Sequence, residues 1–496
     1  MEQADYKINR PEVKITPSRY RNAIGKYRIR RSKACIACGK CMEICPYGVH
    51  QKGKIKMAMP QDYLCVGFSC NQCIEACPEK ALALDINPSS KVIGDKRWTP
   101  DLIISTWYMA ETGRVPPGDL EYKIGDSNGG FDRLEFKFQK EAPGRELDPD
   151  KFSTVIPLNR SGDNREKIRI NLPVYGGGMS FGSIALKVII ARARAWQAWN
   201  SFTCTGEGGY PQELYPYDDH VITQVATGLF GVREETIKRV RMVEFKYAQG
   251  AKPGLGGHLL GDKVTPEVAK MREAVPGNPL FSPFPFHSVY SVEDHKKHID
   301  WIKEINPKGL VSVKVSTPTD VDMVAVGSYY AGAHIIHLDG SYGGTGAAPD
   351  IAKKNIAMPI EYAIVKVHNF LKEEGIRDKI TVIVSGGIRT AYDVAKAMAL
   401  GADGVVVGTA EMVAVECIRC SNCESGRGCA RGIASTDPEL NRTIDLDWAT
   451  QRLINMFQAW RSQLIEILYR LNMSDIRELV GRTDCLRHLD YEENYS

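Results

Sequence analysis

The sequence predicts an α/β protein built on a closed (β/α)8 barrel, with a small cysteine-rich domain in front of it. From residue 168 onward, short apolar runs alternate with amphipathic stretches, which is the strand-and-helix succession of a parallel sheet. The runs end in glycine-rich or polar loops, and a barrel carries its chemistry on the loops after its strands. An open dinucleotide-binding sheet is the rival. It is disfavoured because no G-x-G-x-x-G follows a strand with an acidic residue about 20 positions on.

Eight cysteines form two runs with the spacing of a ferredoxin that carries two [4Fe-4S] clusters. The runs are Cys35-x2-Cys38-x2-Cys41-x3-Cys45-Pro46 and Cys65-x4-Cys70-x2-Cys73-x3-Cys77-Pro78. The fourth cysteine of each run in such modules binds the other cluster. One predicted cluster is therefore held by Cys35, Cys38, Cys41 and Cys77, and the second by Cys45, Cys65, Cys70 and Cys73. Paired zinc sites are the alternative, but successive x2 spacings before Cys-Pro favour a cluster. The pattern predicts a small α+β ferredoxin-like domain that transfers electrons.

Composition excludes several classes of protein. The chain has 496 residues, enough for about three domains, and its 64 Lys and Arg nearly balance 60 Asp and Glu. We therefore expect no nucleic-acid partner and no membrane surface. We find neither a signal peptide nor an apolar run of about 18 residues, so we expect a cytoplasmic protein. Fourteen cysteines in such a chain indicate metal ligation in a reducing compartment.

We expect five segments along the chain. They are an N-terminal tail (1–25), the ferredoxin-like domain (26–86), a wrapping linker (87–167), the barrel (168–444) and a C-terminal helical segment (445–496). Turn signals and weak periodicity predict that the linker is irregular. Strands are predicted over 168–174, 310–315, 334–338, 380–384 and 404–407, and helices over 363–371, 391–400 and 445–471. The last helix is expected to pack outside the barrel.

Two late loops have the composition of a phosphate site. Ser385-Gly386-Gly387 follows the run 382–384, and Gly408-Thr409 follows the run 405–407. Bare backbone amides on consecutive strand-end loops can approach phosphate oxygens closely. A single Ser-Gly-Gly could be a tight turn, but the pair of loops favours phosphate binding.

Five further motifs lie upstream, in the order 175–182 (Tyr-Gly-Gly-Gly-Met-Ser-Phe-Gly), 205–209 (Thr-Gly-Glu-Gly-Gly), 249–258 (Gln-Gly-Ala-Lys-Pro-Gly-Leu-Gly-Gly-His), 312–314 (Ser-Val-Lys) and 343–349 (Gly-Gly-Thr-Gly-Ala-Ala-Pro). With the two late loops, these motifs resemble the FMN-binding synthase domain of the glutamate synthase family. The resemblance is to the short archaeal-type form with a fused two-cluster ferredoxin module. It covers roughly residues 132–486, including Val-Gly-Arg-Thr-Asp at 480–484.

The resemblance implies a barrel that holds FMN. The implied cofactor-binding residues are Met179, Ser180, Thr205, Gly206, Gln249, Lys314, Gly344, Gly346, Ser385, Gly386, Gly387, Gly408 and Thr409. Lys314 would lie near the N1 and O2 edge, where a cation stabilises the negative charge of reduced flavin. Gln249, Lys252 and Arg272 match the positions that hold 2-oxoglutarate, and two cations suit a dicarboxylate. Glu207 is the candidate for proton handling beside Lys314, with a structural hydrogen-bond acceptor as the alternative.

A third cysteine group has the pattern Cys417-x2-Cys420-x2-Cys423-x5-Cys429. The family places a [3Fe-4S] cluster here, which the resemblance assigns to Cys417, Cys423 and Cys429. Cys420 adds the fourth thiolate that a [4Fe-4S] cluster needs, so the cluster type stays open. A structural zinc site is the remaining alternative.

The chain departs from the family near the substrate side. Leu255, His258 and Tyr342 replace the usual Glu, Gln and Asp, and a His-His-Asp becomes Phe-His-Ser at 286–288. The sequence also runs from Met1 directly toward the cysteine runs, with no glutaminase nucleophile. We therefore expect ammonia to come from a separate glutaminase subunit or from free ammonium.

The cysteine runs and the family resemblance together imply an iron-sulfur flavoprotein glutamate synthase, an oxidoreductase acting on CH-NH2 donors. It would aminate 2-oxoglutarate reductively through 2-iminoglutarate, with electrons from a ferredoxin or an NAD(P)H-oxidising flavoprotein, as a homo- or hetero-oligomer. One alternative is an N-methylglutamate synthase-type subunit, and another is an amino- or hydroxy-acid dehydrogenase that exports electrons. A non-catalytic electron-transfer subunit is disfavoured because Gln249, Lys252 and Arg272 are retained.

Overall fold

The computed structural model describes residues 8–20, 23–125, 130–139, 147–163, 165–344, 346, 348–423 and 428–491. Its centre is a parallel eight-stranded sheet. The strands in chain order are β6 (Val174–Gly176), β7 (Thr203–Cys204), β8 (Val221–Ala226), β9 (Met242–Lys246), β12 (Leu310–Ser316), β13 (Ile335–Asp339), β14 (Thr381–Ser385) and β15 (Gly404–Val407). From β7 to β15 each strand neighbours the next in sequence, and β15 pairs with β6. This order of strands is the one that a (β/α)8 barrel has, as the sequence predicts.

The sheet closes between its first two strands. The Gly176 N–H donates to the Phe202 carbonyl at 2.8 Å, and Gly178 bridges to Cys204 in parallel. The predicted barrel is confirmed. Strands β7, β8 and β9 were not predicted, because their runs are short or carry polar residues.

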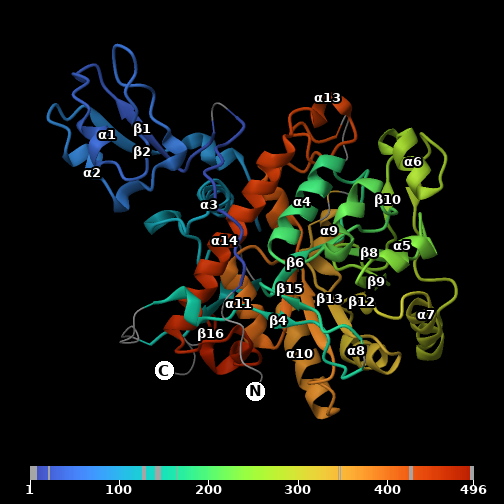
Figure 1. Cartoon of the computed structure of the whole chain (residues 1–496). Helices are drawn as coiled ribbons and strands as arrows, with labels where there is room; N and C mark the ends of the chain where they lie inside the picture. The colour runs from blue at the N-terminus through green and yellow to red at the C-terminus, as the bar shows by residue number, and fades with distance from the viewer. Residues whose placement is uncertain are drawn as a thin grey trace.

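Helices surround the barrel (Figure 1). The larger ones are α4 (Leu186–Ala198), α7 (Val292–Ile305), α8 (Val321–Tyr330), α10 (Ile360–Glu373), α11 (Ala391–Leu400) and α14 (Leu446–Arg470), and the shorter ones are α5 (Glu234–Arg239), α9 (Asp350–Asn355), α12 (Thr409–Ala414) and α13 (Pro438–Asn441). The predicted final helix is confirmed as α14, which packs outside the strands against α4 and α11. No helix in the described part of the chain combines the length and apolarity needed to cross a bilayer.

Small elements complete the chain. The hairpin β10 (His258–Leu259) and β11 (Leu280–Phe281), with α6 (Pro266–Arg272), is inserted between β9 and α7. Two further antiparallel pairs join β3 (Leu134–Phe136) to β16 (Leu486–His488), and β4 (Ile156–Pro157) to β5 (Arg169–Ile170). After β7 the connection is the 3-10 helix Gln212–His220.

The expectation of an irregular linker is wrong for part of its length. It contains α3 (Pro100–Thr112), which is largely buried and packs against α12 and α14. Thr99 caps its first turn, with its Oγ1 accepting the Leu102 N–H, and Gly113 ends it in the left-handed conformation. These two cap residues mark the start and the end of the helix and could have predicted it from the sequence. The weak amphipathic pattern reflects burial of the helix on several sides.

The ferredoxin-like module stands to one side of the barrel (Figure 1). Strands β1 (Tyr27–Arg31) and β2 (Leu82–Ile86) pair antiparallel, and α1 (Lys40–Ile44) and α2 (Gln72–Glu75) contact each other. A small core of its own includes Ile29, Val49 and Met57. The predicted α+β ferredoxin-like architecture is confirmed.

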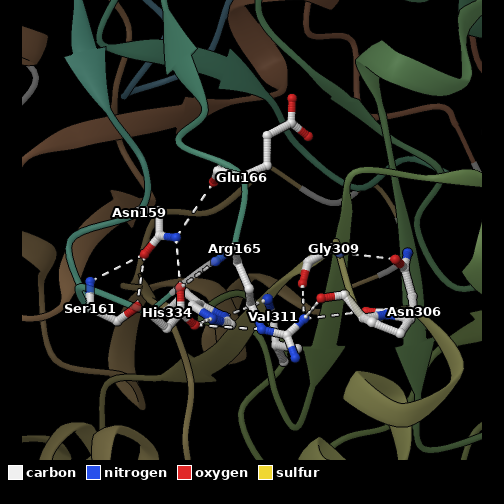
Figure 2. A network of polar contacts seen from close by, with 10 residues as sticks. Asn159, Ser161, Arg165, Glu166, Asn306, Gly309, Val311 and His334 are labelled. Carbon is white, nitrogen blue, oxygen red and sulfur yellow. Dashed lines mark hydrogen bonds and ion pairs between the residues drawn. The ribbon is translucent and has the colours of Figure 1, made fainter.

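A polar network from the linker closes the amino ends of the strands (Figure 2). Arg165 Nη1 donates to three carbonyl oxygens before β12, at 2.7, 3.0 and 3.3 Å. His334 Nε2 lies 2.8 Å from Asp163 Oδ2, while its Nδ1 accepts the Val311 N–H at 2.9 Å. Burial lowers the pKa of His334 to about 4, which leaves Nδ1 unprotonated and able to accept. This end of a barrel serves stability, so the chemistry is expected at the opposite end.

Candidate functional site

A cavity of about 280 Å³ lies at the carboxyl ends of the strands. That volume is near the lower end of the roughly 300–1,000 Å³ typical of ligand pockets. The predicted residues that line it are Met179, Ser180, Glu207, Gln249, Lys252, Arg272, Lys314, Gly344, Gly346, Ser385, Gly386, Gly387, Gly408 and Thr409. Thr205 and Gly206 are not among the lining residues. Gly206 packs behind the amides of Met179 and Ser180 instead.

The two late glycine loops leave open space on the cavity side. A Cβ added at Gly408 would meet nothing closer than the Met179 side chain at 3.9 Å. At Gly387 the nearest atom would be Nη2 of Arg97 at 3.3 Å. Gly386 has φ +97°, and a Cβ there would stand 2.5 Å from the Gly340 carbonyl oxygen. Glycine is therefore required at 386 for backbone packing, while bare amides at 387 and 408 suit an anionic group such as a phosphate.

Under the cavity, a buried network joins four barrel strands. Lys314 Nζ, from β12, lies 3.3 Å from Asp339 Oδ2 at the end of β13. Ser385 Oγ donates to Asp339 Oδ1 at 2.5 Å, and the Gly250 N–H donates to Oδ2 at 2.9 Å. Burial would lower the pKa of Lys314, but Asp339 and Glu244 raise it. Lys314 is therefore a charged side chain inside the barrel, as its predicted role requires.

His337 connects this pair to a second carboxylate. Its Nδ1 lies 2.8 Å from Glu244 Oε2, and its Nε2 lies 2.7 Å from Ser385 Oγ. Burial would raise the pKa of Glu244, but His337, Lys314 and Gln224 lower it to about 2. His337 therefore bridges the carboxylate of Glu244 and the hydroxyl of Ser385, and through Ser385 it joins Glu244 to Asp339.

Glu207 pairs with a lysine that the sequence did not identify. Its Oε2 lies 3.3 Å from Lys246 Nζ and accepts from Ser282 Oγ at 3.4 Å. Lys246 ends β9 and lies in register with Lys314 on β12, so both lysines line the cavity. Lys246 was missed because β9 itself was not predicted. Glu207 therefore has a cationic partner at the wall of the cavity.

Arg272 and Lys252 come from the insertion between β9 and α7. Arg272 ends α6, and its Nη2 donates to Ser180 Oγ at 2.8 Å and to the Phe181 carbonyl at 3.0 Å. Its Nε is buried and has no hydrogen-bond partner among the described residues. Burial lowers the pKa of Arg272 to about 10, against the effect of Glu207, so it stays protonated at neutral pH. A buried unused donor on a cation suits a carboxylate ligand.

The module's cysteines surround two separate cavities. One is lined by Cys35, Cys38, Cys41 and Cys77, and the other by Cys45, Cys65, Cys70 and Cys73. This is the grouping that the spacing predicts, and four thiols around a cavity suit a cluster. Within the described ranges, no three His, Cys, Asp or Glu side chains could hold one metal ion between them.

The third cysteine group borders the main cavity. Cys417, Cys423 and Cys429 line it, whereas Cys420 is exposed and lines only a smaller adjoining cavity together with the other three. The linker fixes this segment from outside. Arg419 Nη2 lies 2.8 Å from Asp95 Oδ2, and the Gly94 N–H donates to the Ile418 carbonyl at 2.9 Å.

We expect Cys420→Ser to leave the third cluster intact, because only the other three thiols face the main cavity. The oxidised variant should keep the EPR signal of a [3Fe-4S] cluster and about eleven irons per chain. About twelve irons in the wild type, without that signal, would instead show a [4Fe-4S] cluster that uses Cys420.

The residues that depart from the family pattern have different environments. Tyr342 lines the cavity at φ +67°, and the Arg97 guanidinium stacks 3.9 Å from its ring centroid. His258 also lines the cavity and stacks on Phe281 at 4.7 Å. Leu255 is exposed and Phe286 is buried in the core. Only the changes at 258 and 342 therefore alter the cavity wall directly.

Residues 131–474 match the model for the conserved region in glutamate synthase, and residues 34–82 match that for the 4Fe-4S dicluster domain. The chain belongs to the glutamate synthase family. Within this family, an archaeal-type glutamate synthase (NADPH) from Thermotoga maritima is 35% identical over 92% of this chain and 94% of its own. An archaeal glutamate synthase (NADPH) from Methanocaldococcus jannaschii is 34% identical over 94% of this chain and 96% of its own.

A larger family member overlaps only in part. The glutamate synthase (NADPH) large chain from Azospirillum brasilense is 34% identical over 63% of this chain and 21% of its own. Among solved structures, a flavocytochrome b2 variant with pyruvate bound covers 74% of this chain at 15% identity and a TM-score of 0.45. That overlap is too distant to add to the family assignment.

Proposed function

We propose that the chain is the synthase subunit of an iron-sulfur flavoprotein glutamate synthase, which aminates 2-oxoglutarate reductively to L-glutamate. The observation that carries the proposal is the composition of one cavity. It combines open glycine loops, the buried Lys314, the cationic Arg272 and three thiols of the third cysteine group. A flavin, a dicarboxylate and a cluster can therefore be held side by side.

We assign the cavity's residues to two ligands. FMN would be held by Met179, Ser180, Gln249, Lys314, Gly344, Gly346 and the loops at 385–387 and 408–409. Gly206 would support the Met179 and Ser180 amides from behind, and the Thr205 hydroxyl donates to the Gly206 carbonyl. 2-Oxoglutarate would be held by Gln249, Lys252 and Arg272. The insertion bearing these three is separate from the strands that carry the flavin loops.

The residues supply binding, charge and protons. When bound, FMN supplies the hydride for C2 of 2-iminoglutarate, which forms from 2-oxoglutarate and ammonia. Lys314 keeps a positive charge under the site because Asp339 and Glu244 offset its burial. Glu207, held by Lys246 and Ser282, is the carboxylate that we assign to proton transfer.

The two thiol sets of the module differ in their distance from the barrel. Cys65 and Cys70 pack against the main core, whereas Cys35, Cys41 and Cys77 pack only against the module's own core. The set of Cys45, Cys65, Cys70 and Cys73 is thus placed toward the barrel. The other set, Cys35, Cys38, Cys41 and Cys77, is placed toward solvent and is called the outer set. We infer that electrons enter at the outer set and pass the third cysteine group before they reach the flavin.

Cys38→Ser tests this inlet. Cys38 is the exposed thiol of the outer set. We expect the variant to lose turnover driven by reduced ferredoxin while it keeps its FMN, because the outer cluster loses a ligand. Cys485→Ser, at an isolated buried thiol, is the control and should keep both. Full ferredoxin-linked turnover in a folded Cys38→Ser protein would contradict the relay.

We also propose the chain's partners and location. Electrons would come from a ferredoxin or an NAD(P)H-oxidising flavoprotein, and ammonia from a separate glutaminase subunit or from free ammonium. We place the protein in the cytoplasm, as part of a homo- or hetero-oligomer. We propose that the five segments predicted from the sequence are the domains of the chain.

An anaerobic spectrum of the purified protein tests the proposed reaction. FMN and iron are quantified first, and the reduced protein then receives 2-oxoglutarate, pyruvate or oxaloacetate, each with ammonium or methylamine. We expect rapid flavin reoxidation and glutamate formation with 2-oxoglutarate and ammonium. A preference for methylamine would indicate N-methylglutamate synthase chemistry. Bleaching of oxidised flavin by an amino or hydroxy acid alone would indicate a dehydrogenase.

A further inference from the structure

The net positive charge of the chain is concentrated in the ferredoxin-like module. Between residues 26 and 86 there are ten Lys and Arg against five Asp and Glu. The whole chain has 64 against 60, which leaves 54 against 55 elsewhere, so the rest is close to neutral. An uneven distribution of this kind steers charged partners toward one part of a protein.

Much of this charge lies beside the outer thiol set. A short hairpin over 51–58 is closed by the Gly53 N–H, which donates to the Lys56 carbonyl at 2.8 Å, and by a bridge between Lys52 and Met57. Met57 lines the cavity of the outer cysteines, as do Arg31 and Lys40. Arg31 Nη1 donates to the Ala58 carbonyl at 2.7 Å and so ties the hairpin to β1.

The hairpin carries three exposed lysines, Lys52, Lys54 and Lys56. Across the described ranges, none of these three lysines forms an ion pair with an acidic side chain. By contrast, Arg30 on β1 pairs with Asp85, and Lys26 pairs with Asp101 at 3.2 Å. The charges of the hairpin are therefore available to a partner.

Exposed apolar side chains accompany the lysines. Ile55, at the tip of the hairpin, is 96% exposed, Met59 is 86% exposed and Ile36, which lines the outer thiol cavity, is 63% exposed. Apolar contacts within a charged rim are the composition of a protein interface. The acidic residues Glu43, Glu75 and Glu79 of the module are exposed as well, but they are a minority.

We propose that this hairpin, with Ile36 and Lys40, is the docking surface for a small acidic iron-sulfur protein that donates electrons. The proposal rests on the proposed function, since it names the partner of the same electron inlet. Each encounter transfers one electron from the partner to the module. Two encounters supply the electron pair that, with two protons, reduces the carbon-nitrogen double bond of the imine. Redox complexes of this type are small, short-lived and steered by charge.

The test compares two charge-reversed variants of the holoenzyme. One combines Lys52→Glu, Lys54→Glu and Lys56→Glu. The control combines Lys308→Glu, Lys372→Glu and Lys379→Glu, three exposed lysines near the amino ends of the barrel strands, and changes the net charge equally. Binding of a purified acidic two-cluster ferredoxin is measured by calorimetry at low and high salt, independently of turnover.

We expect the hairpin variant to bind the ferredoxin about 10- to 100-fold more weakly at low salt, and the difference to shrink at high salt as charges are screened. The control should bind within about twofold of the wild type. Turnover with reduced methyl viologen, a small dye, should be the same in all three proteins, because the dye needs no docking surface.

Unchanged ferredoxin binding in the hairpin variant would overturn the proposal, as would an equal loss in the control. Duplex DNA and vesicles with phosphatidylserine serve as competing polyanions. Hairpin-dependent binding of either one, without hairpin-dependent binding of ferredoxin, would overturn it too. Failure of viologen-driven glutamate formation in the wild type would reject the proposed function while leaving the docking measurement readable.

Discussion

Lys314→Met is expected to destabilise the folded protein by about 3–5 kcal/mol, because it leaves buried carboxylates without their cation. Lys314 Nζ lies 3.3 Å from Asp339, and both side chains are buried. The variant should also bind FMN with a lower reduction potential, since the reduced flavin loses a neighbouring positive charge. Urea unfolding measures the first effect and a redox titration measures the second.

A double variant separates the contribution of the ion pair to stability from that of side-chain packing. In Lys314→Met with Asp339→Asn, one buried charge of each sign is removed, so most of the lost stability should return. The reduction potential of FMN should stay low, because the cation is still missing. A double variant as unstable as the single one would show that packing of the lysine stem, and not the ion pair, holds this region.

Arg272→Ala is expected to lower kcat/KM for the keto acid by about 10- to 100-fold, the cost of one charge-assisted bond to a partly buried carboxylate. FMN should stay bound, because Ser180, which loses the bond from Arg272, is only one of the many residues that line the flavin part of the cavity. Arg272→Lys keeps the charge but cannot repeat the bonds to both Ser180 and Phe181, so it should recover only part of the loss.

The chain offers a matched control beside it. Arg233 pairs with Glu273, the residue after Arg272, and both partners are more than half exposed. Arg233→Ala should change stability and kinetics by almost nothing, as exposed ion pairs contribute little. Normal kinetics in Arg272→Ala with each keto acid and amine would remove the main reason for naming a dicarboxylate substrate. Loss of FMN would assign Arg272 to the cofactor.

Much of the fold was readable from the sequence because periodicity and glycine loops coincide in the second half of the barrel. Strands β12 to β15 are rich in Val, Ile and Leu, although β12 and β13 also carry polar residues, and each is followed by polar or glycine-rich residues. Strand β9 has polar Glu244 and Lys246 pointing into the network and the cavity, and its short pattern did not stand out. A buried polar residue is stable only with partners from other strands, and one sequence does not show those partners.

The site residues also divide into those with a local signal in the sequence and those that depend on partners from distant strands. Gly386 and Gly387, which line the cavity, were predicted because glycine in a loop is a local signal. The pair of His337 and Glu244 was not predicted, since its members are 93 residues apart and meet only in the closed barrel. The eight module cysteines line two cavities in the predicted groups, and the crossing of the fourth cysteine of each run follows from the known spacing of two-cluster ferredoxins.

The insertion between β9 and α7 gives the barrel a modular construction. Arg272 and Lys252 are carried on a segment that begins and ends at neighbouring barrel elements, while the flavin loops belong to the barrel strands themselves. On the proposed roles, selection of the organic acid can diverge by exchange of one inserted segment, provided that Gln249 and the bond from Arg272 to Ser180 are kept for the flavin. Relatives with altered insertions then become a natural source of amine-forming catalysts for other keto acids.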